Sequence, residues 1–252
     1  MRISADLFKF VNLKSHQLII FMDVSYSLII QKTSVMKKGQ FTASVFISVF
    51  IMLSMSLSSQ EMNDSIIKAI SNGNLEEVEN YIGKGIDVNQ LHRSGNPPLN
   101  FAIWSGNPDM VKLLVTNGAD VKLNTERSGT ALNVAAGTGN QEICDYLIQN
   151  GADMNARDNE GRTPLMFAIY NKHKDLARFF IDQGADVNIQ EPNGWSALMF
   201  ATMVGDLEIV KSLVEAGADI NMKTSSGQTA LQRAELIGHE DIVDFLKKSG
   251  AE

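Results

Sequence analysis

The sequence phrase that decides the fold is five residues long and returns at a fixed interval. It reads GIDVN at 85–89, GADVK at 118–122, GADMN at 151–155, GADVN at 184–188 and GADIN at 217–221. Each phrase begins 33 residues after the one before, and a repeated alanine keeps the same interval at Ala69, Ala102, Ala135, Ala168, Ala201 and Ala234. A fixed period of this length predicts a stack of supersecondary units, each too small to bury a core alone.

Local signals within each period predict two short helices and a loop. A Thr or Ser precedes a short apolar run and can cap the first helix, as Thr163 does ahead of Pro164. A pair such as Gly205-Asp206 then turns the chain into a second helix with apolar residues at helical spacing. The glycine of the next phrase ends that helix in a left-handed conformation. The expected capping residues are Thr130, Thr163, Ser196 and Thr229.

Two blocks of sequence carry a resemblance to a known family. GRTPLMFA at 161–168 and GQTALQRA at 227–234 resemble the ankyrin signature G-x-T-P-L-H-x-A. Together with the recurring phrase, they make residues 59–252 similar to ankyrin-repeat proteins. The resemblance implies an all-α solenoid of stacked helix–turn–helix units with hairpin loops. Its units would be 59–91, 92–124, 125–157, 158–190, 191–223 and 224–252.

The two end units differ from the others. The unit 59–91 has no block like those above, and Lys247 in the last unit replaces the apolar residue found at Val214 and Ile181. Terminal repeats of a stack need such a polar outer face. We therefore expect a complete solenoid of six units.

The histidine of the ankyrin signature is absent from every unit. Its positions hold Asn100, Asn133, Met166, Met199 and Gln232. In the family this histidine ties one loop to the next, a role that Asn and Gln can keep in part and Met cannot. Ser128 also stands where Gly161 would align, and Asn171-Lys172 replaces the turn glycine. These departures predict altered rigidity between repeats, not a different fold.

Residues 36–58 read as a secretory signal peptide. Two lysines follow Met36, an uncharged apolar run extends from Phe41 to Leu57, and small serines come next. The basic start of a signal peptide normally lies at the N-terminus of the protein, but here 35 residues precede Met36. We therefore interpret residues 1–35 as an over-long gene model. The alternative is an uncleaved membrane anchor, although 17 apolar residues are at the short end for a spanning helix.

The charge of the chain is unevenly distributed. Up to Ser58 the sequence has two acids and six bases, which leaves 29 − 2 = 27 acids and 22 − 6 = 16 bases in the remainder, a formal charge of −11. A module this acidic repels phosphate, so a nucleic-acid partner is not expected.

Residue types that carry chemistry have structural explanations here. We interpret His92 and His173 as surface loop residues and His239 as a turn residue. Cys144 aligns with apolar valines of other units, and as a single cysteine it excludes an intrachain disulfide and a Cys-based metal site. One aspartate of each recurring loop phrase repeats along the stack: Asp87, Asp120, Asp153, Asp186 and Asp219. Because these aspartates belong to the phrase that builds the loops, we do not interpret them as a row of cation-binding sites. We expect no enzymatic activity, cofactor, metal site or small-molecule substrate.

Candidate partner-binding residues follow the repeated alanine. Trp104, Tyr170, Met203 and Leu236 share one position, so stacking would align them into a stripe interrupted at Gly137. An exposed apolar stripe framed by polar groups marks an interaction site, and Trp, Tyr and Arg are frequent anchors. Trp195 and nearby arginines would form its rim. The predicted binding residues are Trp104, Tyr170, Trp195, Met203, Arg127 and Arg162.

The alternative is that these side chains fold onto neighbouring helices and extend the core. For Leu236 and Ile237 the two interpretations weigh about equally, because a terminal unit can bury them. For Phe101, Phe167 and Phe200, one position before the repeated alanine, packing into the core is the favoured interpretation.

The sequence therefore predicts a monomeric, non-catalytic scaffold, periplasmic or secreted, that binds a protein through the concave face. One alternative is a membrane-anchored accessory to an envelope enzyme or stress-defence system. The other is a cytoplasmic regulatory adaptor, which requires that the run from Phe41 to Leu57 is not exported. The identity of the partner does not follow from the repeat pattern.

Overall fold

The computed structural model describes residues 61–252. The predicted extension 1–35 and signal peptide 36–58 lie outside the described residues. All regular elements of the described part are helices, and its only β pairings are the isolated bridges Thr125–Gly129 and Gln190–Ser196. An unlabelled helix covers 61–71, and the others are α4 (Leu75–Gly83), α5 (Pro98–Trp104), α6 (Pro108–Thr116), α7 (Ala131–Thr138), α8 (Gln141–Gln149), α9 (Pro164–Tyr170), α10 (Lys174–Asp182), α11 (Ala197–Val204), α12 (Leu207–Glu215), α13 (Ala230–Ile237) and α14 (Glu240–Lys248).

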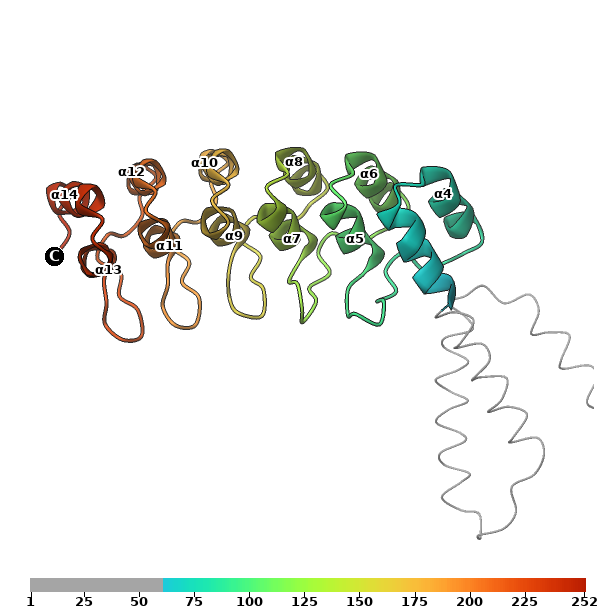
Figure 1. The fold of residues 1–252 in the computed structure, drawn as a ribbon, viewed down its shortest axis with the longest axis horizontal. Helices are drawn as coiled ribbons and strands as arrows, with labels where there is room; N and C mark the ends of the chain where they lie inside the picture. The colour runs from blue at the N-terminus through green and yellow to red at the C-terminus, as the bar shows by residue number, and fades with distance from the viewer. Residues whose placement is uncertain (1–60) are drawn as a thin grey trace, which may run out of the picture. The chain divides into compact units, whose positions relative to one another are not determined.

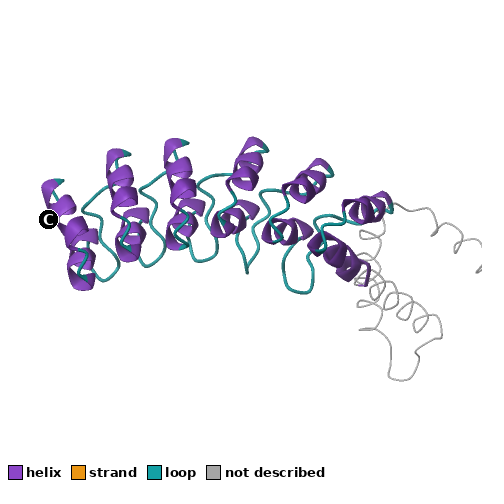
Figure 2. Ribbon diagram, turned by 45° about the horizontal axis from the view of Figure 1, so that its top comes forward, coloured by secondary structure: helices purple, strands orange, loops and turns teal. Residues whose placement is uncertain are grey.

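The helices form two rows, with the hairpin loops projecting along one edge (Figure 1). The inner row consists of α5, α7, α9, α11 and α13, each packed against the next, and the outer row consists of α4, α6, α8, α10, α12 and α14. Figure 2 shows the same succession of helix pairs from a second direction. The predicted all-α solenoid is confirmed.

The predicted caps begin the inner helices. The side chains of Thr130, Thr163, Ser196 and Thr229 each accept a hydrogen bond from the backbone N–H three residues later. Pro164 occupies the first turn of α9, where the missing N–H leaves no bond unmade. A capping bond of this kind contributes about 1 kcal/mol, which matters for helices only seven or eight residues long.

The turn between paired helices requires a left-handed residue. Gly139 and Gly205 have φ angles of +78° and +75°, and in the unit 158–190 the same turn position holds Lys172 with φ +62°. A Cβ on Gly139 or Gly205 would meet the imidazole of His173 or His239 at 2.5 to 2.8 Å. The turn that follows Lys172 carries Asp206 in place of such a histidine, which explains why this unit accommodates a side chain.

The core runs the length of the stack between the two helix rows. Each repeated alanine is at most 1% exposed, and its small side chain lets consecutive inner helices approach closely. Cys144 is fully buried, as predicted, and burial raises the pKa of its thiol to about 12. Each buried Leu, Ile or Phe side chain contributes about 1.5–3 kcal/mol. Fully buried examples include Ile103, Leu132, Leu147, Phe180 and Leu213.

The recurring phrase builds the loops and links each one to the next. Its Asp accepts a hydrogen bond from the backbone two residues later, as Asp186 does from the N–H of Asn188 at 2.9 Å. Its Asn then reaches the next unit: Asn188 donates to the carbonyl of Gly217 at 3.1 Å and accepts from the N–H of Asp219 at 2.8 Å. Asn89, Asn155 and Asn221 also accept from the following unit. Lys122 cannot repeat this bond, so the asparagine ladder is interrupted there.

The residues that replace the signature histidine behave differently from one another. Asn133 donates to the carbonyls of Ala156 and Arg162 and so links its unit to the next, as predicted for an amide. Gln232 instead accepts from the N–H of Thr229 in its own unit. The Nδ2 of Asn100 is buried and has no hydrogen-bond partner among residues 61–252. Met166 and Met199 are buried and cannot make such a link between loops.

His92 and His173 lie in loops, as predicted, but their side chains are partly buried and not simply at the surface. The His92 side chain is 13% exposed, lies 2.9 Å from Asp64 and packs edge-on against Phe101. The Nε2 of His173 lies 3.0 Å from the carbonyl oxygen of Gly137 in the preceding unit. Both imidazoles therefore link neighbouring units, which single-sequence spacing could not reveal.

Candidate functional site

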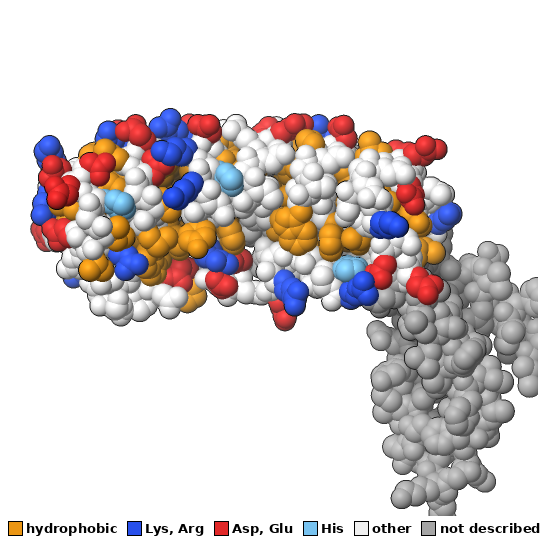
Figure 3. Space-filling model, viewed as in Figure 1, with side chains coloured by type: hydrophobic (Ala, Val, Ile, Leu, Met, Phe, Trp, Pro, Cys, Tyr) orange, Lys and Arg blue, Asp and Glu red, His pale blue; other side chains and the backbone are white. Residues whose placement is uncertain are grey.

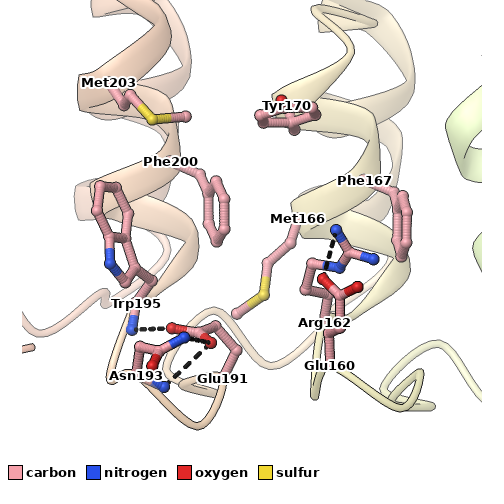
Figure 4. A pocket seen from close by; sticks show the side chains of 10 residues that line it. All are labelled: Glu160, Arg162, Met166, Phe167, Tyr170, Glu191, Asn193, Trp195, Phe200 and Met203. Atoms are coloured by element: carbon pink, nitrogen blue, oxygen red, sulfur yellow. Dashed lines mark hydrogen bonds and ion pairs between the residues drawn. The ribbon is translucent and has the colours of Figure 1, made fainter. Parts of the chain in front are cut away.

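A pocket of about 280 Å³ lies between α9 and α11 and the hairpins that precede them (Figure 4). Two successive units contribute to it, 158–190 and 191–223, so neither could form it alone. The lining residues are Glu160, Arg162, Met166, Phe167, Tyr170, Glu191, Asn193, Trp195, Phe200 and Met203.

The walls of the pocket are mostly apolar, with four aromatic rings and two methionines among the ten lining residues. Phe200 lies between two other rings: its centroid is 5.5 Å from that of Trp195 and 6.3 Å from that of Tyr170. Met166 points into the space between α9 and α11, and Met203 lies opposite Tyr170 at the far end (Figure 4). Aromatic rings offer a large apolar surface with few conformations to lose on binding, and the flexible thioethers can adapt to the shape of a ligand.

The polar groups of the pocket are held by the protein itself. The buried carboxylate of Glu191 accepts from the N–H groups of Asn193 and Trp195 and from the Asn193 side chain, each at 3.0 Å. Arg162 donates to Asp158 at 2.8 Å and pairs with Glu160 at 3.0 Å, while its guanidinium covers the Phe167 ring at 4.6 Å. These contacts fix the loops in place, so the walls are formed before a ligand arrives.

The structure brings four of the six predicted binding residues together. Tyr170, Trp195, Met203 and Arg162 all line the pocket. Trp104 lies on α5 in another unit, 46% exposed, with its ring 5.3 Å from Phe101. Arg127 lies exposed on the hairpin loop before α7. These two residues belong to the same row of units but not to the pocket.

Exposed apolar side chains continue along the inner row. Figure 3 shows hydrophobic side chains gathered in a band at the level of the inner helices. Tyr170 is 57% exposed, Leu236 69% and Ile237 41%, so the last unit does not bury its two aliphatic residues. Gly137 leaves the position between Trp104 and Tyr170 without a side chain, as the spacing predicts.

The sequence interpretation missed several residues of the site. Phe167 and Phe200 pack against the core as predicted, yet each also presents a face to the pocket. Glu191 and Asn193 form the loop that carries Trp195, a role that only three-dimensional contacts reveal. Arg233 stacks on Trp195 with its Cζ 4.7 Å from the ring centroid. Its position matches that of Phe200 one unit earlier, and this substitution was the signal available in the sequence.

The described part of the chain offers little for catalysis. Among residues 61–252, no three His, Cys, Asp or Glu side chains are arranged to hold a metal ion. The raised pKa of Cys144 keeps its thiol protonated, which makes it a poor nucleophile. No helix of the same range has the length and apolar character needed to cross a bilayer.

Comparison with family models agrees with the geometry. A model described as three copies of ankyrin repeats matches residues 117–191 and 179–252, and a model of many ankyrin copies matches residues 81–135. The chain belongs to the ankyrin-repeat family. Ankyrin repeats generally mediate protein–protein interactions and are generally non-catalytic scaffolds. No curated protein sequence matches the chain significantly.

Proposed function

We propose that this ankyrin-repeat chain is an exported scaffold that holds a protein partner against its inner helix row. The observation that supports the binding site most directly is the preformed pocket of Tyr170, Trp195, Phe200 and Met203. Its walls are apolar and partly exposed, and its polar groups are already satisfied within the chain. Such a surface gains from burial by a partner without breaking internal bonds.

Mutagenesis of the stripe tests the proposal. In the full chain, Trp104→Ala and Tyr170→Ala should each abolish partner capture in crosslinking pull-downs from the native envelope. Because both side chains are about half exposed, the unfolding midpoint should remain nearly unchanged. Tyr146→Ala, on the outer helix α8, is the matched control and should retain capture. A large loss of stability without loss of capture would contradict the proposal.

Export is supported by the basic, apolar and small-residue succession of residues 36–58. N-terminal sequencing of the native protein distinguishes the three locations. A mature start near Ser59 supports release to the periplasm or beyond. An intact Met36 in the membrane fraction supports the anchored alternative, and an intact Met36 in the cytosol supports the adaptor.

A further inference from the structure

The side chain of Arg233 stands next to the pocket without an anionic partner. Its guanidinium lies over the Trp195 ring, and its Nε is buried with no hydrogen-bond partner among residues 61–252. Within the same range, no carboxylate lies within 4.0 Å of it. By contrast, Arg162 and Arg178 have carboxylate partners at 2.8 Å and 3.8 Å. The Arg233 side chain as a whole is only partly buried, so an incoming carboxylate can pair with its unpartnered charge.

The carboxylates near Arg233 are engaged elsewhere. Glu191 is buried and accepts three hydrogen bonds from its own hairpin. Glu235, two residues along α13, pairs with Lys247 at 2.7 Å. Glu191 and Glu235 therefore do not neutralise the charge of Arg233, although the repeats are strongly acidic as a whole. A partner carboxylate would meet one defined cation here instead of a generally basic surface.

The size of the pocket fits a single bulky side chain. Sites for drug-sized ligands commonly measure about 300–1,000 Å³, and this pocket, at about 280 Å³, is below that range. Arginines already cover the rings of Phe167 and Trp195. The charged lining residues Glu160, Arg162 and Glu191 are bonded within the chain, and the other walls are mostly aromatic rings and methionines, so a neutral apolar side chain is the better occupant.

The distance between the pocket and Arg233 determines how far apart in a bound segment the two contacting side chains must be. Arg233 is on α13, the inner helix that packs beside α11. Packed helices lie about 8–10 Å apart, and an extended chain advances about 3.3 Å per residue. Because only alternate side chains of an extended segment face the same way, the two contacts come from side chains two or four positions apart, about 7 or 13 Å, which bracket this spacing.

We infer that the site binds an extended protein segment with an apolar side chain for the pocket and a carboxylate about two or four residues away for Arg233. The inference rests on the proposed function, because it assigns the chemistry of the partner held at the same surface. Arg233 thereby selects among apolar segments by charge, whereas the aromatic walls supply the contact area.

Selection from a random dodecapeptide display library on the full chain tests both ideas. We expect the wild type to enrich peptides with an apolar residue and an Asp or Glu about two or four positions away. Arg233→Gln should enrich the apolar residue without the acid. Arg178→Gln, which removes the same charge from the outer helix α10, should select as the wild type does. Enrichment of apolar peptides without the acid overturns the inference alone, and no enrichment at all overturns the proposed function as well.

A thermodynamic cycle then measures the contact. Replacing the Glu of a selected peptide by Gln should weaken binding to the wild type roughly tenfold, as for a charge-assisted hydrogen bond. The same replacement should change binding to Arg233→Gln by less than about twofold. Equal losses for both chains would show that the carboxylate does not contact Arg233. Far-ultraviolet circular dichroism and the unfolding midpoint must match between the chains, so that a folding defect is not mistaken for lost recognition.

Discussion

Two joints of the same solenoid are built differently. The second joint connects units 92–124 and 125–157, and the fourth joint connects units 158–190 and 191–223. At the fourth joint Asn188 makes both ladder bonds, and Tyr170 packs edge-on toward Phe200. At the second joint Lys122 interrupts the ladder, and Val134 and Gly137 stand where Phe200 and Met203 align, so no ring of the next unit faces Trp104.

The second joint keeps other links. Ser128 donates to Asn96 at 2.6 Å, and Lys112 pairs with Glu142 at 2.9 Å. The latter pair is exposed, and such ion pairs contribute little to stability. The comparison shows that a pocket forms where bulky inner residues of two units meet across a fully bonded joint. At the second joint valine and glycine replace two of these bulky residues and lysine replaces the ladder asparagine, and the family fold remains without those pocket walls.

The largest expected difference between the joints comes from Gly161→Ala and Gly95→Ala. Both glycines are left-handed, with φ +73° and +83°, so either alanine costs about 1–2 kcal/mol. A Cβ at Gly161 would also lie 2.5 Å from the Pro192 ring, whereas at Gly95 the nearest atom is 3.7 Å away on Arg127. We expect Gly161→Ala to lose about 3 kcal/mol or more and Gly95→Ala about 1, measured by urea unfolding. Equal losses would mean that the hairpins pack alike at both joints.

A smaller effect is expected from restoring the ladder. Lys122→Asn should gain about 1 kcal/mol of unfolding free energy, because its amide can bond the next unit as Asn188 does. The reciprocal change Asn188→Lys should lose a similar amount. Native-state hydrogen exchange at the amide of Asp153 measures the new bond locally. Unchanged exchange in Lys122→Asn would contradict the assignment of the break to this residue.

The smallest effect concerns the helix–helix turns of the two regions. Lys172→Gly should stabilise the chain by about 0.5 kcal/mol, because relief of the left-handed lysine exceeds the added entropy of the unfolded glycine. Gly106→Lys is the matched reverse, since an added Cβ there meets nothing within 4 Å. We expect it to lose about 1 kcal/mol. Thermal unfolding of both variants measures the pair, and a loss in Lys172→Gly would show that the lysine side chain makes a compensating contact.

The fold was predictable because the period fixes it. The capping residues, the left-handed glycines and the buried alanines are all where the 33-residue interval places them. The histidine contacts were not predictable, because His92 and His173 act on residues 28 and 36 positions away in sequence. Spacing locates a residue on a unit but does not say how far its side chain reaches.

The candidate site was predictable only in part. Tyr170 and Met203 share a repeat position, which sequence alignment of the units reveals. Phe200 has two roles, since one face of its ring packs on the core and the other lines the pocket. Arg233 stands where the preceding unit has a phenylalanine, and this difference is visible in the sequence. That its guanidinium has no carboxylate partner among residues 61–252 is visible only in the structure.

The buried thiol of Cys144 can serve as a probe of local opening in the stack. Thiolate is the reactive form of cysteine, and a pKa of about 12 leaves almost none of it at neutral pH while the unit 125–157 is closed. The thiol regains the pKa and reactivity of an exposed cysteine only when that unit opens. The rate of its alkylation therefore measures the frequency of opening next to the interrupted ladder. The same burial sets the sign at high pH: since the folded pKa is raised, stability falls as pH rises from about 9 toward about 12. Alkylation of the Cys144 sulfur therefore measures how often the unit 125–157 opens.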